Sequence, residues 1–292
     1  GCGIVCGGQG MPCPYGSLLF GLDSFSYFVL LFLSLVTRHL LTMRLILFFF
    51  CALLLSCNAP PTDGLLIATA ANMQFAIKPL MESFTQETGI YCKSVLSSSG
   101  KLTAQIREGA PFDIFVSADM MYPMALYQSG FALNEPRIYA YGTLVLWTVR
   151  DGLQPTFETL TTDKIQHIAI ANPKTAPYGV AAMEVLAQYD LYKSVKNKLV
   201  FGENIAQANQ FITTQAAAIG FTAKSVVLSP NISQKGAWID VPQTDYTPLA
   251  QGIVLLKNAE KKPIKAKQFY DFVLSAKGKE ILRDFGYRTD VD

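Results

Sequence analysis

Four positions in the chain combine residue types and surroundings that suit the binding of an anion. Asn72, Ser99, Tyr178 and Ile205 each lie at the start of a segment with helical spacing of apolar residues, and the first three follow short apolar strands. A helix N-terminus exposes unpaired backbone N–H groups and carries a partial positive charge. Because ligands of open α/β sheets bind beyond the carboxyl ends of the strands, these positions predict an anion site. Asn72 and Ser99 would add side-chain donors to it.

Each of these positions, taken alone, has a simpler interpretation as a helix cap. Asn and Ser are frequent caps, which contribute about 0.5–2 kcal/mol to stability and nothing to function. The anion-site hypothesis therefore requires the four helix starts to converge in the fold, and spacing alone does not establish that.

An enzymatic alternative comes from Ser98 and Lys101, which have the spacing of a serine acyl-enzyme motif. Lys174-Thr175-Ala176 is a partial match to the Lys-Thr-Gly element of such enzymes, and their Ser-Asp-Asn element is missing. A nucleotide-binding phosphate loop is excluded, since Val95 and Leu102 occupy positions that need glycine and Ser or Thr. We therefore expect a binding protein and not an enzyme.

Charge and metal-binding residue types narrow the function further. After Cys57 the chain keeps 22 basic and 21 acidic residues, because Arg38, Arg44 and Asp23 precede it. A near-neutral body without a long basic run argues against nucleic acid as a partner. His167 is the single histidine of the body, which is too few for a histidine-based metal site.

The first part of the chain has the pattern of an export signal. Met43-Arg44 followed by the apolar run 45–55 resembles a signal peptide, and Leu54-Leu55-Ser56-Cys57 resembles a lipobox that ends in a lipidated cysteine. We expect 1–42 to be upstream leader of doubtful translation, 43–57 to be the signal peptide and 58–64 a tether. Two alternatives remain open: plain cleavage near Ala59, and a membrane span over 18–36, although Asp23 lies inside it.

The body alternates strand and helix patterns from Leu65 to the C-terminus, which predicts an α/β architecture with mainly parallel sheets. Pro79 predicts a kink or early break in the first helical segment. The strand-forming run 142–149 marks the start of a second domain, and 269–285 predicts one terminal helix. Cys92 is the only cysteine of the body, so no disulfide is expected there.

Several stretches of the body resemble the molybdate-binding proteins of ABC transporters, the ModA family. They are Ala70-Ala71-Asn72, Ser98-Ser99-Gly100-Lys101-Leu102, Gly109–Phe115, Ala171–Gly179, Glu203-Asn204-Ile205 and Ile219-Gly220-Phe221. The stretch Ala171–Gly179 is the most specific of them. The resemblance runs in the same order from about Leu65 to Tyr287.

This resemblance implies a bilobal periplasmic-binding-protein fold of type II, with a ligand cleft between lobe 1 (65–141 plus 248–292) and lobe 2 (142–247). Asn72 and Ser99 would bind a tetrahedral dianion from the first lobe. Tyr178 and Ile205 would bind it from the second lobe, mainly through backbone amides, with Ala71 and Ser98 as weaker candidates. The chain departs from many relatives at Ala223, where they carry a tyrosine, and at Asn72, where part of the family has serine.

The chemistry of these positions favours a fully deprotonated anion. Phosphate keeps a proton near neutral pH and benefits from an acceptor, whereas molybdate, tungstate and sulfate suit a site made only of donors. The resemblance implies capture of molybdate or tungstate as cargo, so that metal is held only within the oxyanion and no cofactor is needed. Another oxyanion such as sulfate stays open as an alternative.

The same resemblance implies the partners and the compartment. We expect delivery to an ABC transporter permease with its ATPase, a monomeric protein, and a location in the periplasm or on the outer face of the cytoplasmic membrane. A lipid anchor on Cys57 would attach the protein to that membrane.

Overall fold

The computed structural model describes residues 21–54, 64–232 and 235–289. The chain divides into two units, 1–60 and 61–292, and each is considered by itself. The proposed lipidation residue Cys57 and all of the expected tether except Gly64 lie outside the described residues.

The first unit contains one long helix, α1 (Gly21–Leu54). Neither glycine nor proline occurs between Leu22 and Leu54, so neither of these helix-breaking residues interrupts the helix. Among the described residues, no helix combines the length and the apolar character needed to cross a membrane. The alternative span over 18–36 begins outside the described residues.

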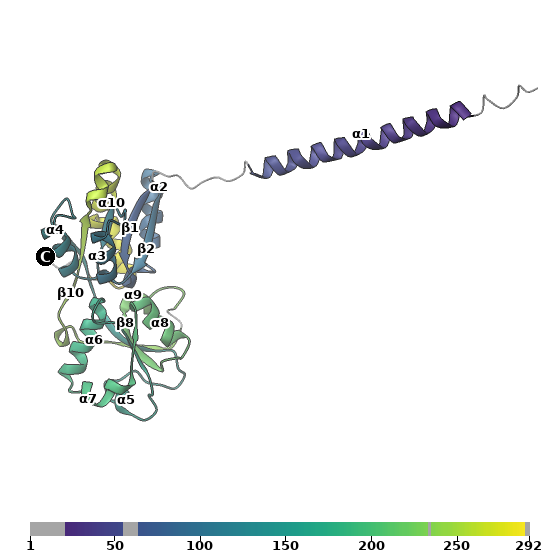
Figure 1. Ribbon diagram of the computed structural model, residues 1–292. Helices are drawn as coiled ribbons and strands as arrows, with labels where there is room; N and C mark the ends of the chain where they lie inside the picture. Colours follow the sequence, from purple (N-terminus) through teal and green to yellow (C-terminus); the bar gives the residue numbers. More distant parts are fainter. Residues whose placement is uncertain (1–20, 55–63, 233–234, 290–292) are drawn as a thin grey trace, which may run out of the picture. The chain divides into compact units, whose positions relative to one another are not determined.

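The second unit contains two five-stranded sheets (Figure 1). In the first sheet the strand order is β2-β1-β3-β10-β4. Its strands are β1 (Leu65–Ala70), β2 (Cys92–Ser97), β3 (Ile114–Val116), β4 (Arg137–Gly142) and β10 (Leu249–Leu255). The helices of this half are η1 (Ala71–Met73), α2 (Ile77–Thr88), α3 (Ser99–Arg107), α4 (Met121–Gln128), η4 (Lys257–Lys261), α10 (Pro263–Leu274) and α11 (Ala276–Asp284).

The second sheet has the strand order β7-β6-β8-β5-β9. Its strands are β5 (Leu144–Thr148), β6 (Ile168–Ala171), β7 (Leu199–Gly202), β8 (Ile219–Ala223) and β9 (Ala237–Asp240). The helices of this half are α5 (Phe157–Thr161), α6 (Pro177–Gln188), α7 (Tyr192–Val195), η2 (Lys196–Lys198), α8 (Ile205–Thr213), α9 (Lys224–Val227) and η3 (Gln243–Asp245).

Both sheets are mixed, which corrects the expectation of mainly parallel sheets. Each has two parallel pairings among its first three strands in the order above, and β10 and β5 run antiparallel to both of their neighbours. The antiparallel direction follows from the path of the chain between the sheets. The chain passes from β4 to β5 through Thr143 and returns from β9 to β10. Because β5 and β10 each start where the chain enters a sheet, they run away from the crossing, opposite to the neighbouring strands. The lobe boundaries themselves stay a prediction.

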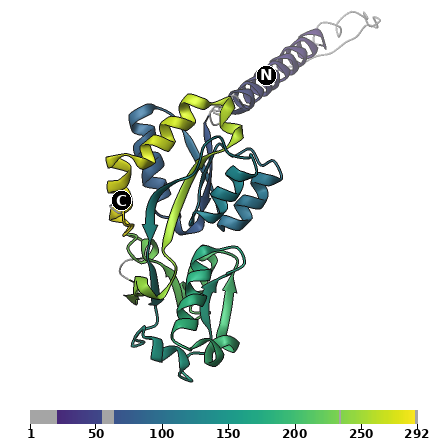
Figure 2. The same cartoon turned by 90° about the vertical axis from the view of Figure 1, so that its left-hand side faces the viewer.

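Each sheet has a hydrophobic core of its own. In the first half the core lies on both faces of the sheet, and α10 and α11 of the C-terminal part pack against α2 (Figure 2). The second half has one large cluster around Trp147, which is fully buried. Ala70, Ala71 and Ala118 from the first half pack into that same cluster, so the two halves of this unit are in contact.

Two helices differ from the sequence-based expectation. The helical segment that was expected to break at Pro79 breaks before it, because η1 ends at Met73 and α2 starts at Ile77. Pro79 then lies in the first turn of α2, where its missing N–H costs nothing. The terminal segment forms two helices instead of one. Ser275 separates them because its side chain accepts a hydrogen bond from the Gly278 amide at 3.1 Å and so caps α11.

The Gly109–Phe115 stretch has a structural role. Asp113 is fully buried, and its carboxylate accepts hydrogen bonds from the Leu66 amide (2.8 Å) and the Asn258 side chain (2.7 Å). Lys262 lies 3.3 Å from the same carboxylate. Asp113 therefore ties β1 and the segment after β10 together, away from the predicted anion site.

Candidate anion-binding site

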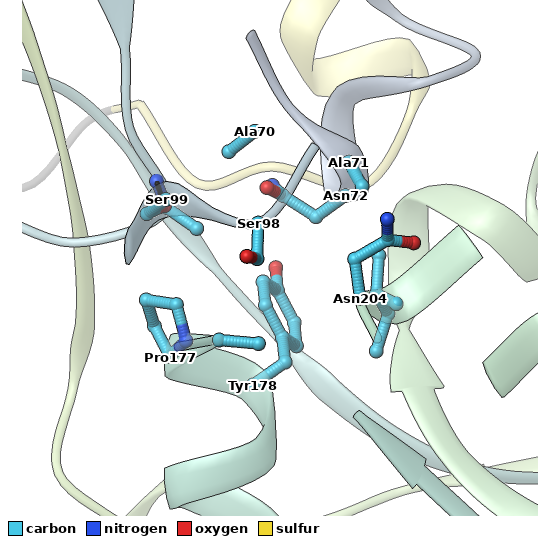
Figure 3. A pocket seen from close by; sticks show the side chains of 11 residues that line it. Ala70, Ala71, Asn72, Ser98, Ser99, Pro177, Tyr178 and Asn204 are labelled. Atoms are coloured by element: carbon cyan, nitrogen blue, oxygen red, sulfur yellow. Dashed lines mark hydrogen bonds between the residues drawn. The ribbon is translucent and has the colours of Figure 1, made fainter. Parts of the chain in front are cut away.

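The predicted site residues meet in one pocket between the two halves of the second unit. It encloses about 210 Å³ of space free of atoms, part of it open to solvent. It is lined by Ala70, Ala71, Asn72, Ser98, Ser99, Ala118, Ala176, Pro177, Tyr178, Asn204 and Ile205 (Figure 3). This set contains all four main candidates and both weaker ones, and it contains no acidic, basic or histidine side chain.

Four helical segments begin at this pocket. The strand and helix pattern predicted the helix starts, but not that they meet. The segments η1 and α3 follow β1 and β2 of the first sheet, while α6 and α8 follow β6 and β7 of the second. Among the described residues, the backbone amides of Ser99, Tyr178 and Ile205 donate to no group outside their own helices. Because first-turn N–H groups also lack partners within a helix, these three donors are free for a ligand.

Ser99 adds a side-chain donor. It is buried, and its Oγ accepts a hydrogen bond from the Ala118 amide at 3.1 Å. An oxygen held in this way keeps its own hydrogen for a further acceptor. Ser98 is the N-cap of α3, with its Oγ 3.4 Å from the Lys101 amide, and so has a structural role as well.

Asn72 is held from several sides. Its Nδ2 donates to Gln251 Oε1 (2.9 Å) and to the Tyr287 hydroxyl (3.0 Å). Its backbone carbonyl accepts from Ser225 Oγ (2.8 Å) and from the same Tyr287 hydroxyl (3.1 Å). Its Oδ1 is buried and has no hydrogen-bond partner within the described residues. These contacts hold Asn72 at the wall of the pocket.

Tyr178 extends from the start of α6 toward the side of the pocket that carries Ser98 and Asn72 (Figure 3). Its hydroxyl accepts a hydrogen bond from Gln251 Nε2 at 3.1 Å. Burial is the main cause that raises the pKa of Tyr178 well above its ordinary value, with the nearby Tyr287 and Tyr246 adding to it. The phenol stays protonated, and the pocket stays uncharged.

Ile205 begins α8, and Asn204 caps that helix by accepting from the Gln207 amide at 3.1 Å. The apolar Ile205 side chain is buried, so the residue can contribute to a ligand only through its backbone. Ala223 does not line the pocket. It lies at the end of β8, fully buried, opposite Leu144 of β5.

Sequence reasoning missed the residues that support Asn72 from distant positions in the sequence. Gln251 and Tyr287 contact Asn72, and Ser225 donates to its carbonyl. Gln251 and Tyr287 lie 179 and 215 positions from Asn72, and no local pattern marks them. Only the folded chain reveals their place in the site.

Comparison with known proteins places this geometry in a family. The sequence profile of bacterial extracellular solute-binding proteins matches residues 65–288. The molybdate-binding protein ModA of Azotobacter vinelandii is 36% identical over 236 residues, which cover 80% of this chain and 93% of that protein. This chain belongs to the ModA family of bacterial extracellular solute-binding proteins.

Two further comparisons agree with this family. ModA of Rhodobacter capsulatus is 36% identical over 241 residues, covering 82% of this chain and 94% of that protein. The solved structure of the Azotobacter vinelandii periplasmic molybdate-binding protein superposes with a TM-score of 0.72 at 33% identity, covering 76% of this chain and 98% of that one. The bilobal ModA fold is therefore that of the second unit, which corresponds to almost all of the solved protein.

Proposed function

We propose that this chain captures molybdate or tungstate outside the cytoplasm and delivers it to the permease of an ABC transporter, whose ATPase drives uptake. The observation that carries the proposal is the convergence of four helical N-termini on one uncharged pocket. The names of the ModA relatives support molybdate as the ligand.

The donor set supports a fully deprotonated anion. Backbone amides of Ser99, Tyr178 and Ile205 and the Ser99 hydroxyl can donate, and helix dipoles add partial positive charge. A site without a charged side chain also suits release to a transporter, because no buried ion pair has to be broken. We infer that Asn72, Ser99, Tyr178 and Ile205 contact the anion, with Ala71 and Ser98 beside them.

The local geometry gives no support to acyl-enzyme chemistry at Ser98. The Nζ atom of Lys101 forms an ion pair with Glu203 Oε1 at 2.6 Å and is therefore engaged by that carboxylate, not by Ser98. The Ser98 hydroxyl is a helix cap. The anion is cargo in this proposal, and no cofactor takes part.

Calorimetry tests the proposal directly. The second unit, residues 61–292, has its own cores and can be titrated with molybdate, tungstate, sulfate and phosphate. We expect tight binding of molybdate and tungstate and much weaker binding of the other two. Sulfate or phosphate binding as tightly as molybdate would contradict the specific assignment and leave a general oxyanion carrier.

We also propose that the protein is lipid-anchored through Cys57 to the outer face of the cytoplasmic membrane and acts as a monomer. The support is the lipobox pattern 54–57 together with the extracellular family. Expression of the full chain in a bacterial host, followed by membrane fractionation and mass spectrometry, should find a diacylglycerol on this cysteine. A Cys57→Ala variant found in the membrane fraction to the same extent would contradict the anchor.

A further inference from the structure

The amide nitrogen of Asn72 is directed towards Gln251 and Tyr287 and away from the pocket. Both hydrogens of its Nδ2 are used by Gln251 and Tyr287, so the end that remains for the pocket is the carbonyl oxygen Oδ1. That oxygen is buried and without a partner among the described residues. An acceptor beside a dianion is repelled by it, and an unpaired buried carbonyl is costly by itself.

Gln251 controls the orientation of that amide. It is fully buried on β10, and its Oε1 accepts from Asn72 Nδ2 at 2.9 Å and from the Tyr139 hydroxyl at 2.6 Å. Its Nε2 donates to the Tyr178 hydroxyl at 3.1 Å. One side chain thus connects Asn72 of the first half with Tyr178 of the second.

The two amides can only turn together. A side-chain amide has a donor end and an acceptor end of nearly the same shape, and a half-turn exchanges them. If Asn72 turned alone, its Oδ1 would face Gln251 Oε1 at about the distance that the present hydrogen bond spans, oxygen against oxygen. If both turn, Gln251 Nε2 donates to Asn72 Oδ1 and the contact is restored.

The neighbouring hydroxyl groups can follow this exchange. The Tyr139 hydroxyl can accept from Gln251 and still donate to the Ser117 carbonyl, 3.2 Å away. The Tyr178 hydroxyl accepts from Gln251 Nε2 in the structure. After the exchange it donates to Gln251 Oε1 instead. Tyr287 can donate to the turned Asn72 oxygen, while Ser225 keeps the Asn72 backbone carbonyl satisfied. Every buried group in the network keeps a partner, and Asn72 Nδ2 gains a free N–H for the pocket.

We propose that Gln251 is a positioning residue for anion capture: the orientation of its amide sets that of Asn72, and the orientation in which both are turned presents Asn72 Nδ2 to the anion as a donor. This inference rests on the proposed function. Tyr178 links the change to the second half of the unit, because its hydroxyl is the other partner of Gln251.

The space around Gln251 and Tyr178 supports a closely fitted contact. Gly142, the last residue of β4, lies so near both side chains that a Cβ atom there would collide with the Tyr178 hydroxyl and with Gln251 Nε2. Only glycine leaves room for this contact at the point where the chain crosses to the second sheet. Gly142→Ala therefore disturbs the pair without removing a polar group.

A double-mutant cycle tests the coupling. Molybdate affinity is measured by calorimetry for residues 61–292 as wild type, Asn72→Ala, Gln251→Met and the double variant. We expect each single variant to lose about tenfold in affinity, equivalent to about 1.4 kcal/mol. The double variant should lose no more affinity than Asn72→Ala alone, because Gln251 acts through Asn72. Gln128→Met, at an exposed position of α4, is the control for replacing glutamine by methionine.

A nuclear magnetic resonance measurement reports the state of the Asn72 amide. The side-chain N–H pair of Asn72, identified by its loss in Asn72→Ala, should shift on addition of molybdate to the wild type. In Gln251→Met this shift should be largely lost, which a general loosening of the fold would not produce. Tyr178→Phe replaces Gln251→Met if the latter fails to fold, since it removes one partner of Gln251 and keeps the backbone amide.

The outcomes separate the two ideas. Losses that multiply in the double variant, or an unchanged affinity of Gln251→Met, would overturn the positioning role while wild-type binding upheld the proposed function. A wild type that binds none of the four oxyanions would overturn the proposed function and this inference with it.

Discussion

Lys101 and Glu203 join the two halves of the second unit beside the pocket, with 2.6 Å between Lys101 Nζ and Glu203 Oε1. Lys101 is in the first turn of α3, and Glu203 directly follows β7. The adjacent Gly100 amide donates to the Thr175 carbonyl at 2.9 Å across the same boundary. These contacts hold the halves together at the edge of the site.

Removing this ion pair should weaken anion capture slightly. Both side chains are about half exposed, so Glu203→Gln should cost at most about 1 kcal/mol of binding free energy. As salt screens the ion pair, the molybdate affinity of the wild type should approach that of the variant. Calorimetry with molybdate at low and high ionic strength measures both. Asp271→Asn breaks an exposed pair with Lys267 on α10 and should leave affinity unchanged; an equal loss in that control would contradict the explanation.

A side chain at position 100 should hold the halves apart. A Cβ on Gly100 would lie 2.8 Å from the Tyr122 hydroxyl and 3.0 Å from the Thr175 Cα atom. Gly100→Ala should therefore reduce molybdate affinity by about 1–3 kcal/mol, the usual cost of overpacking. Its effect on the melting temperature should be small, since each half keeps its own core. Gln105→Ala, on the exposed face of the same helix, is the matched control.

Loss of the Ser99 hydroxyl should weaken binding by about 1–3 kcal/mol, because a hydrogen bond to a charged group is removed. Ser99→Ala also leaves the Ala118 amide without its acceptor. Ser98→Ala provides the comparison, since that residue caps α3. It should lower thermal stability more than affinity. Equal molybdate affinities of Ser99→Ala and the wild type would remove Ser99 from the site.

Three buried tyrosines around Asn72 should make the protein sensitive to alkali. Burial is the main cause that raises the pKa values of Tyr139, Tyr178 and Tyr287 above the ordinary 10.0. Because the folded state keeps these protons more firmly than the unfolded chain, the free energy of unfolding should be undiminished below pH 10 and should fall as pH rises further. Denaturant titrations across this range measure the fall.

A Tyr287→Phe variant should show a shallower alkaline decrease, although its stability at neutral pH is lower because it loses the contact with Asn72. In the wild type, tyrosinate absorbance from these three groups should appear together with unfolding. Free titration of all three in the folded protein would contradict their burial in the network.

Local sequence features predicted the positions of the pocket-lining residues because these features are themselves local. A short apolar strand, a polar turn and a helix cap are all encoded within about ten residues, as at Ser97–Arg107 and Ala171–Gln188. The convergence of the four helix starts depended on the family resemblance, since spacing contains no information on which strands become neighbours.

The sequence did not predict the mixed sheets or the hydrogen-bond network behind Asn72. The direction of β5 and β10 follows from two crossings of the chain between the sheets. A strand-forming run of residues predicts a strand but does not indicate whether it pairs parallel or antiparallel. Gln251 occurs in an ordinary strand pattern, and its role arises only because folding buries it between Tyr139, Asn72 and Tyr178. Contacts over such separations have no periodic signature.

The lining of the pocket has a consequence for energetics. Its eleven residues include one ionisable group, the phenol of Tyr178, and burial keeps that phenol protonated. Loading with a fully deprotonated anion therefore exchanges no proton with the medium. The heat of molybdate binding near neutral pH should therefore be the same in buffers of different ionisation enthalpy.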